Sequence, residues 1–138
     1  MPAKDTYHDV VKNALIKDGW TITADPYPIK YEEIKLVADL AGEKTISASR
    51  EGEKIVIEIK SFTSRSPMRE FETALGQYLI YQTFLSITHP DRKVYLAVGN
   101  NIYGRFFQQI AIELILQKYQ ILLLVVDLKK EEIVKWIS

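Results

Sequence analysis

Apolar and polar positions follow two different spacings along the chain, and these spacings separate helices from strands. Apolar residues at helical spacing predict a first helix over 4–18, which Gly19 ends. A second helix is predicted over 68–87, with Pro67 in its first turn, and a third over 102–118. Short runs rich in β-branched residues predict strands, and these runs cover 20–24, 34–40, 45–49, 53–60, 94–98 and 121–127.

The order of these elements predicts an α/β (α+β) fold, in which flanking helices cover a mixed β-sheet. Two prolines within 25–28 predict a break between the strands at 20–24 and 34–40, since proline cannot donate a backbone hydrogen bond in the middle of a sheet. Later in the chain helices and strands alternate, and the apolar strands 94–98 and 121–126 fit central or parallel positions. The tail at 131–137 fits either a strand or a helix. The length of 138 residues fits one domain spanning 1–138.

The segment IVIEIKSF at 55–62 places two charges in the most β-prone part of the chain. Side chains alternate along a strand, so Glu58 and Lys60 share one face. A two-residue turn at 51–52 sets the register of the preceding hairpin and places Thr45 opposite Glu58. The same register puts the apolar side chains of both strands on the other face, which supports it.

Two further acids precede this hairpin and extend the charged face. Glu43 lies opposite Lys60 in the predicted register, and Asp39 stands just upstream. Carboxylates gathered at a sheet edge suit Mg²⁺ or Mn²⁺, which prefer oxygen ligands. A lysine beside such a metal can orient or activate water and stabilise charge on a phosphate. A solvated face with cross-strand ion pairs has the same pattern, so these residues alone leave both interpretations open.

The helix that follows carries ALGQYLIYQ at 74–82. Gln77 and Tyr81 are four residues apart and therefore share one helix face. The Gln77 amide has donors and an acceptor with which it could hold a lysine, a metal-bound water or a phosphate. The alternative is structural: Gln77 fills a local polar gap, and Tyr81 is a half-buried core residue.

Composition narrows the function classes. The chain has 18 basic and 18 acidic residues, so a contact with DNA needs a local patch or charge from a partner. No apolar run approaches the ~20 residues of a membrane helix, and the first residues lack a secretory core. The absence of cysteine excludes disulfides and thiolate zinc sites. A cytoplasmic protein that does not enter a membrane is expected.

An acid followed by Glu-x-Lys on a hairpin, and then by Gln-x-x-x-Tyr on a helix, resembles the motif of the PD-(D/E)xK nucleases. That superfamily has the restriction-endonuclease-like fold. The whole chain more closely resembles the XisH family, the fdxN-element excision controlling factors of cyanobacteria. The segments that carry this resemblance span nearly the full length, and they are 7–20, 39–44, 58–62, 74–81, 95–98 and 133–137.

The resemblance implies roles for four residues of the hairpin and the helix. It makes Glu58 a metal ligand and Lys60 the catalytic lysine. It makes Gln77 and Tyr81 accessory residues of the site.

The first acid of the motif has two candidates, because no Pro-Asp pair of the kind found in the superfamily precedes Glu58. Asp39 matches in type and order, whereas Glu43 lies on the charged face of the hairpin. Asp9, on the first helix, is a weaker candidate for an extra acid that some resolvase-type members place there.

The function implied by the resemblance is control of DNA-element excision, with Mg²⁺- or Mn²⁺-dependent cleavage of DNA phosphodiester bonds. The implied partners are DNA, an XisI-like companion protein and a site-specific recombinase, and a homo-oligomer is left open. The alternative is a non-catalytic regulatory subunit that keeps the nuclease fold. A nuclease of DNA repair or defence is a third hypothesis.

Overall fold

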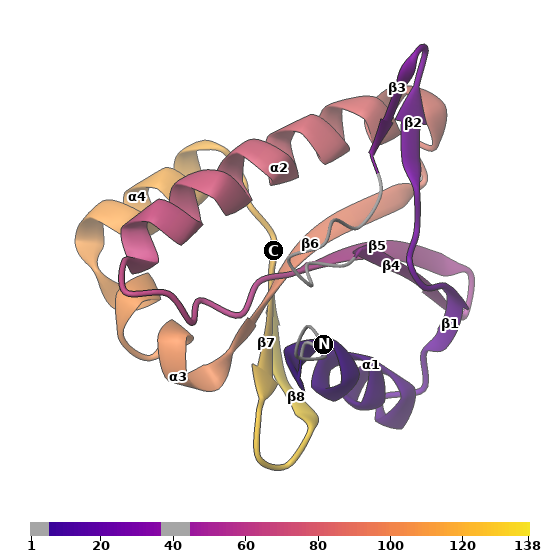
Figure 1. The fold of residues 1–138 in the computed structure, drawn as a ribbon. Coiled ribbons are helices and arrows are strands. Elements are labelled where there is room, and N and C mark those ends of the chain that lie inside the picture. Colours follow the sequence, from indigo (N-terminus) through magenta and orange to yellow (C-terminus); the bar gives the residue numbers. More distant parts are fainter. Residues whose placement is uncertain (1–5, 37–44) are drawn as a thin grey trace, which may run out of the picture.

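The computed structural model describes residues 6–36 and 45–138, and a six-stranded mixed sheet forms its centre (Figure 1). The strand order is β1-β4-β5-β6-β7-β8, in which β5, β6 and β7 are parallel and the other neighbours are antiparallel. The bounds are β1 (Thr21–Ala24), β4 (Thr45–Arg50), β5 (Glu53–Ile59), β6 (Arg92–Gly99), β7 (Leu123–Asp127) and β8 (Glu132–Ile137).

Helices cover both faces of this sheet. One face carries α1 (Thr6–Lys17), as Figure 1 shows. The other face carries α2 (Pro67–Thr88), α3 (Asn100–Tyr103), the 3₁₀ turn η1 (Phe106–Gln108) and α4 (Ile110–Lys118). A separate two-stranded hairpin of β2 (Ile29–Tyr31) and β3 (Ile34–Leu36) packs beside α2, where Tyr31 stacks on Phe84. The structure therefore confirms the mixed α and β architecture.

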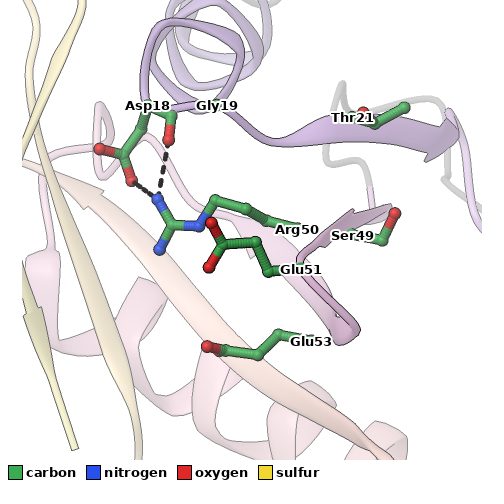
Figure 2. Close-up of a pocket in the computed structure, with 7 residues that line it drawn as sticks. All are labelled: Asp18, Gly19, Thr21, Ser49, Arg50, Glu51 and Glu53. Atoms are coloured by element: carbon green, nitrogen blue, oxygen red, sulfur yellow. Dashed lines mark hydrogen bonds and ion pairs between the residues drawn. The ribbon is translucent and has the colours of Figure 1, made fainter.

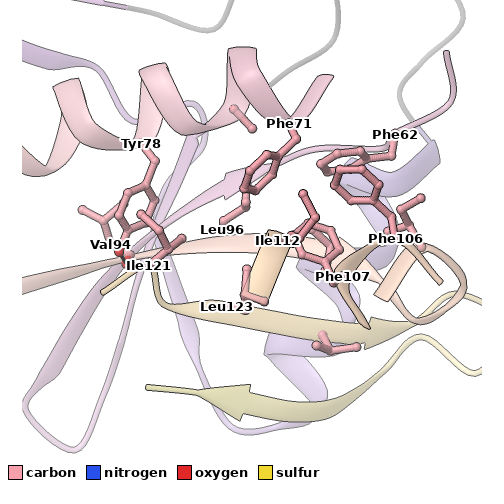
Figure 3. Close-up of a cluster of buried hydrophobic side chains, with 14 of the residues drawn as sticks. Phe62, Phe71, Tyr78, Val94, Leu96, Phe106, Phe107, Ile112, Ile121 and Leu123 are labelled. Carbon is pink, nitrogen blue, oxygen red and sulfur yellow. Dashed lines mark hydrogen bonds between the residues drawn. The ribbon is translucent and has the colours of Figure 1, made fainter. Parts of the chain in front are cut away.

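The two faces of the sheet bury different side chains. The α1 side is mainly aliphatic and includes Ile55, Ile57 and Ile59 of β5. The α2 side is rich in aromatic rings, and it takes Val56 from the same strand (Figure 3). Successive side chains of β5 thus enter opposite cores, and the run from Ile55 to Ile59 is buried throughout, as expected for a central strand covered on both faces.

The aromatic rings on the α2 side join α2 to the segment after β6. Phe71 of α2 meets Phe106 and Phe107 edge-on, with ring centroids 5.6 and 5.9 Å apart. Edge-to-face pairs of this kind add about 0.5–1.5 kcal/mol each beyond burial of their area. These contacts hold α2 over the parallel strands.

The predicted hairpin register is confirmed for every described pair. Thr45 lies opposite Glu58, Ile46 opposite Ile57 and Arg50 opposite Glu53. The turn residue Glu51 has φ 50° and Gly52 has φ 86°. Positive φ at both positions is typical of the type I′ turn, whose twist matches that of the strands.

Other strand predictions have mixed outcomes. The apolar strands near 94–98 and 121–126 are central and parallel as predicted, and the ambiguous tail forms the edge strand β8. The strand predicted over 34–40 is described only as far as Leu36, and its remainder lies outside the described residues. The short strand β2 was not predicted, because Pro26 and Pro28 indicated only a break.

The single helix predicted over 102–118 is wrong. The chain there forms α3, η1 and α4 in succession, and Gln109 between the last two is extended, with φ −67° and ψ 138°. The physical reason is that Phe106 and Phe107 are both buried. One regular helix would point two consecutive side chains in directions about 100° apart, so the local break allows both rings to enter the core.

In the part of the chain that the structure describes, no helix combines the length and the apolar character needed to cross a membrane.

Candidate functional site

Strand β5 carries the two charged residues singled out by the sequence. The strand lies between β4 and β6, and the pairing with β6 continues through Lys60, whose backbone N–H donates to the Ala97 carbonyl at 3.1 Å. Val56 packs in the core on the α2 side. Glu58 and Lys60 follow it at alternate positions and thus belong to that face.

Burial distinguishes these two residues from an ordinary charged surface. Glu58 and Lys60 are each only 2% exposed. Removing such ions from water costs several kcal/mol each, so buried charges are normally paired or bound to a metal. The interpretation as a solvated sheet face is therefore wrong.

The pKa of Tyr78, which lies between the sheet and α2, is affected by the charged groups around it. Burial raises the pKa of its hydroxyl, and the charges of Tyr95 and Glu58 raise it further, against a hydrogen bond from the Leu122 backbone. The hydroxyl donates to the Val94 carbonyl at 2.9 Å and accepts from the Leu122 N–H at 3.1 Å. The negative charge of Glu58 therefore acts on the interior between the sheet and α2.

Gln77 and Tyr81 lie on the helix that covers this face. Both side chains are half-buried, the Gln77 Oε1 atom is buried, and Tyr81 packs against the aromatic core. Their neighbour Tyr78 is fully buried and marks the inward face of α2. The structure thus brings the two helix residues into the layer to which Glu58 and Lys60 belong.

The two candidates for the first acid, Asp39 and Glu43, lie outside the described residues. Asp9 is half-buried on α1, which packs against the other face of the sheet. Within 6–36 and 45–138, no three or more His, Cys, Asp or Glu residues gather closely enough to hold a metal ion. The buried carboxylate of Glu58 fits a hard divalent cation in donor chemistry. A complete ligand set would need a further donor from 37–44.

A second buried cluster escaped the sequence analysis. His8 on α1 is 3% exposed, and its Nε2 donates to Asp25 Oδ2 at 2.9 Å. Lys12 Nζ donates to the same oxygen at 2.9 Å. Burial raises the pKa of Asp25, but the hydrogen bonds and charges of Lys12 and His8 outweigh this effect and leave the pKa lowered. No local spacing indicates a contact across 17 residues.

A polar hollow at the opposite end of the hairpin has a structural explanation. Figure 2 shows Arg50 reaching Asp18, and its Nη1 donates to the Asp18 carbonyl at 2.7 Å and to Oδ2 at 2.8 Å. The guanidinium also lies 4.4 Å from the centre of the Trp20 ring. Arg50 thus fastens the hairpin turn to the end of α1, because each of its interactions is internal.

Comparison with known proteins gives concordant results. A family model described as XisH protein matches residues 1–134. The crystal structure of an XisH family protein from Nostoc punctiforme superposes on this chain with a TM-score of 0.90. The two sequences are 42% identical, and the match covers 97% of this chain and 100% of that one. A fdxN element excision controlling factor protein from Anabaena variabilis is 43% identical over 97% and 99% of the two chains, with a TM-score of 0.90. The search of curated proteins returned no match.

Proposed function

The chain belongs to the XisH family, and from this premise we propose that it controls excision of a DNA element by acting on DNA as a divalent-metal-dependent endonuclease of PD-(D/E)xK type. The observation that carries the proposal is the complete burial of Glu58 and Lys60 on one face of a central strand. The related protein from Anabaena variabilis is a fdxN element excision controlling factor. Control of excision is thus the role that the family supports, and nuclease activity is the step we add.

Each residue of the layer has a role in this proposal. Glu58 holds the metal, with Asp39 or Glu43 as the second acid, and Mg²⁺ or Mn²⁺ when bound supplies positive charge that stabilises the phosphate. The Lys60 ammonium donates a hydrogen bond that orients the attacking water and offsets charge developing on a phosphate oxygen. The Gln77 amide holds Lys60 or the water, and Tyr81 packs beside it.

Partners complete the proposed role. Strand exchange belongs to a site-specific recombinase, and an XisI-like companion protein works with this chain. A chain with no net charge contacts DNA through a local patch or together with such partners.

The first test is metal binding and cleavage. We expect calorimetry to show Mn²⁺ binding to the wild-type chain that Glu58→Gln abolishes. We also expect Mg²⁺- or Mn²⁺-dependent cutting of linear, supercoiled or branched DNA, alone or with the companion, that Glu58→Gln and Lys60→Met abolish. Glu53→Gln and Lys54→Met are matched controls, because they make the same changes at exposed positions of the same strand. A wild-type chain that neither binds the metal nor cuts any of these DNA forms would refute the nuclease role.

A second candidate function rests on a different observation. Large apolar side chains are exposed on the helices of the α2 side, with Ile87 at 59%, Ile110 at 86% and Leu114 at 65%. Ile110 and Leu114 lie four residues apart on one face of α4, and adjacent exposed apolar side chains are typical of a surface that binds another protein. The chain would then be a non-catalytic regulatory subunit that binds the companion or the recombinase.

An excision assay separates the two functions. The regulatory role predicts that Lys60→Met leaves excision intact, whereas Ile110→Asp with Leu114→Asp abolishes it without unfolding the chain. The nuclease role predicts that Lys60→Met alone abolishes excision.

A further inference from the structure

A hollow of about 400 Å³ opens beyond the carboxyl ends of the parallel strands β5 and β6. One wall comes from the segment after β5, with Phe62, Ser64 and Arg65, and the other from the segment after β6, with Arg105 and Phe106. In open sheets with parallel strands, ligands bind outside the carboxyl ends of the strands. The hollow thus lies where such a fold places a ligand.

Two arginines from separate segments line this hollow. Arg65 and Arg105 are both exposed, and neither forms an ion pair with a described carboxylate. Arg50 is different, because it is paired with Asp18 and stacked on Trp20. Two guanidiniums that line one hollow suit an anion, since their planar fork of donors matches the oxygens of a phosphate.

Aromatic packing joins the two walls. Phe62 is 7% exposed, and its ring lies 6.1 Å from that of Phe106 and 5.4 Å from that of Phe107 (Figure 3). Its backbone has φ 53°, a left-handed conformation uncommon for residues other than glycine. Strained backbone of this kind clusters at ligand sites and persists where the surroundings enforce it. The buried rings therefore hold the backbone segments of both arginines in fixed relation.

The loop that carries Arg65 is also held from its far end. The Ser64 N–H donates to Glu70 Oε2 at 2.8 Å, and Ser66 Oγ accepts from the Arg69 N–H at 3.2 Å. Glu70 is thus engaged by the loop backbone and does not pair with either arginine of the hollow. These hydrogen bonds restrain the loop, and such restraint lowers the entropic cost of binding a ligand.

The hollow and the Glu58–Lys60 pair lie on the same side of the sheet. Lys60 ends the β5 pairing five residues before Arg65, and Phe62 and Phe106 belong to the core on the α2 side. We propose that Arg65 and Arg105 together bind a backbone phosphate of the DNA strand, near the phosphate that would be cleaved. The proposal rests on the proposed function, and it names the local basic patch that a chain of zero net charge requires.

DNA affinity measured against salt tests this site without any need for cleavage. Fluorescence anisotropy follows binding of labelled duplex and branched DNA to the full chain in EDTA, at several NaCl concentrations. Arg65→Ala and Arg105→Ala should each raise the Kd several-fold and lower the slope of log K against log [salt], and the double variant should lower this slope by about 0.9, the value for one phosphate contact. Lys93→Ala is the matched control, because Lys93 is exposed near the opposite end of β6 and should change neither quantity.

The outcomes separate this proposal from the nuclease role. Unchanged affinity and slope in both arginine variants would overturn the phosphate site, even where Glu58 and Lys60 prove essential for cutting. Weakened binding in a chain that never cuts DNA would support the site and refute the nuclease. If inorganic phosphate or a mononucleotide competes as effectively as unlabelled DNA, the assignment of DNA as the ligand is overturned. A chain that binds no DNA would overturn both the phosphate site and the nuclease role.

Discussion

The protein buries charge at two places, and these places are built differently. Glu58 lies on the central strand β5, and Lys60 stands two residues later, directly after the strand ends at Ile59. His8 and Lys12 of α1 instead meet Asp25, 17 and 13 residues away in the chain, through two contacts of 2.9 Å. The second cluster fastens a helix to the segment that leaves the edge strand β1, whereas Glu58 and Lys60 are near neighbours in the chain.

This difference separates a structural cluster from the proposed functional one. The contacts of Asp25 stabilise the arrangement of α1, because they close a loop of chain and satisfy buried polar atoms. Burying both Glu58 and Lys60 costs free energy of desolvation. The proposed function would give a reason to hold both charges at such a cost. The two sites should therefore respond in opposite ways to the loss of charge.

Removing both charges of β5 should produce the largest effect. In the double variant Glu58→Gln, Lys60→Met we expect DNA cleavage to fall by a factor on the order of 10²–10³ or more, because both charged groups of the site are lost. The free energy of unfolding should stay unchanged or rise by about 1–4 kcal/mol, since neutral side chains escape the desolvation penalty. Cleavage rates and urea unfolding measure the two quantities. A strongly destabilised double variant would assign the pair a structural role.

Removing the charge of Asp25 should have the reverse effect. Asp25 Oδ2 accepts hydrogen bonds from His8 and Lys12. Asp25→Asn removes the negative charge and can turn an NH₂ group toward these two donors, so we expect a loss of about 1–3 kcal/mol in the free energy of unfolding. Cleavage by the folded variant should stay within a few-fold of wild type. Urea unfolding and cleavage rates again check this, with Asp91→Asn at an exposed position as the control. A variant that is as stable as wild type but cleaves DNA more slowly would show that Asp25 has a functional role and not a structural one.

The pH dependence sharpens the same contrast. The pKa of Asp25 is lowered in the folded protein, where Lys12 and His8 outweigh burial. Its contribution to stability is therefore fully present above the unfolded value near 3.8 and is lost as the pH falls below that value toward the folded pKa. The difference in unfolding free energy between wild type and Asp25→Asn should be constant at pH 5–7 and shrink at pH 3. A difference that persists unchanged at pH 3 would contradict this.

The smallest effect should come from a charge pair on the surface. Lys54 Nζ lies 3.5 Å from Asp91 Oδ2, and both side chains are largely exposed. Solvent and salt screen such pairs, so Lys54→Ala should not shift the thermal unfolding midpoint measurably. A clear shift that disappears at high salt would show that exposed charges also contribute to the stability of this fold.

The sequence by itself determined the local parts of the fold and of the site. Alternation along β5 and the turn at Glu51 and Gly52 were enough to predict the hairpin register, because both depend on residues near one another in the chain. The same local rules placed Glu58 and Lys60 on one face. The resemblance that these motifs carry predicted the XisH family, which the comparisons confirmed.

Only the tertiary structure decided which of these charges are buried and what else lies close to them. Helical spacing over 102–118 gave way to a broken helix because Phe106 and Phe107 both enter the core. The approach of His8 to Asp25 and of Arg65 to the hollow beside Arg105 depends on how distant segments pack. Contacts of this kind gain their free energy from burial across the whole sheet, and no short-range pattern in the chain encodes them.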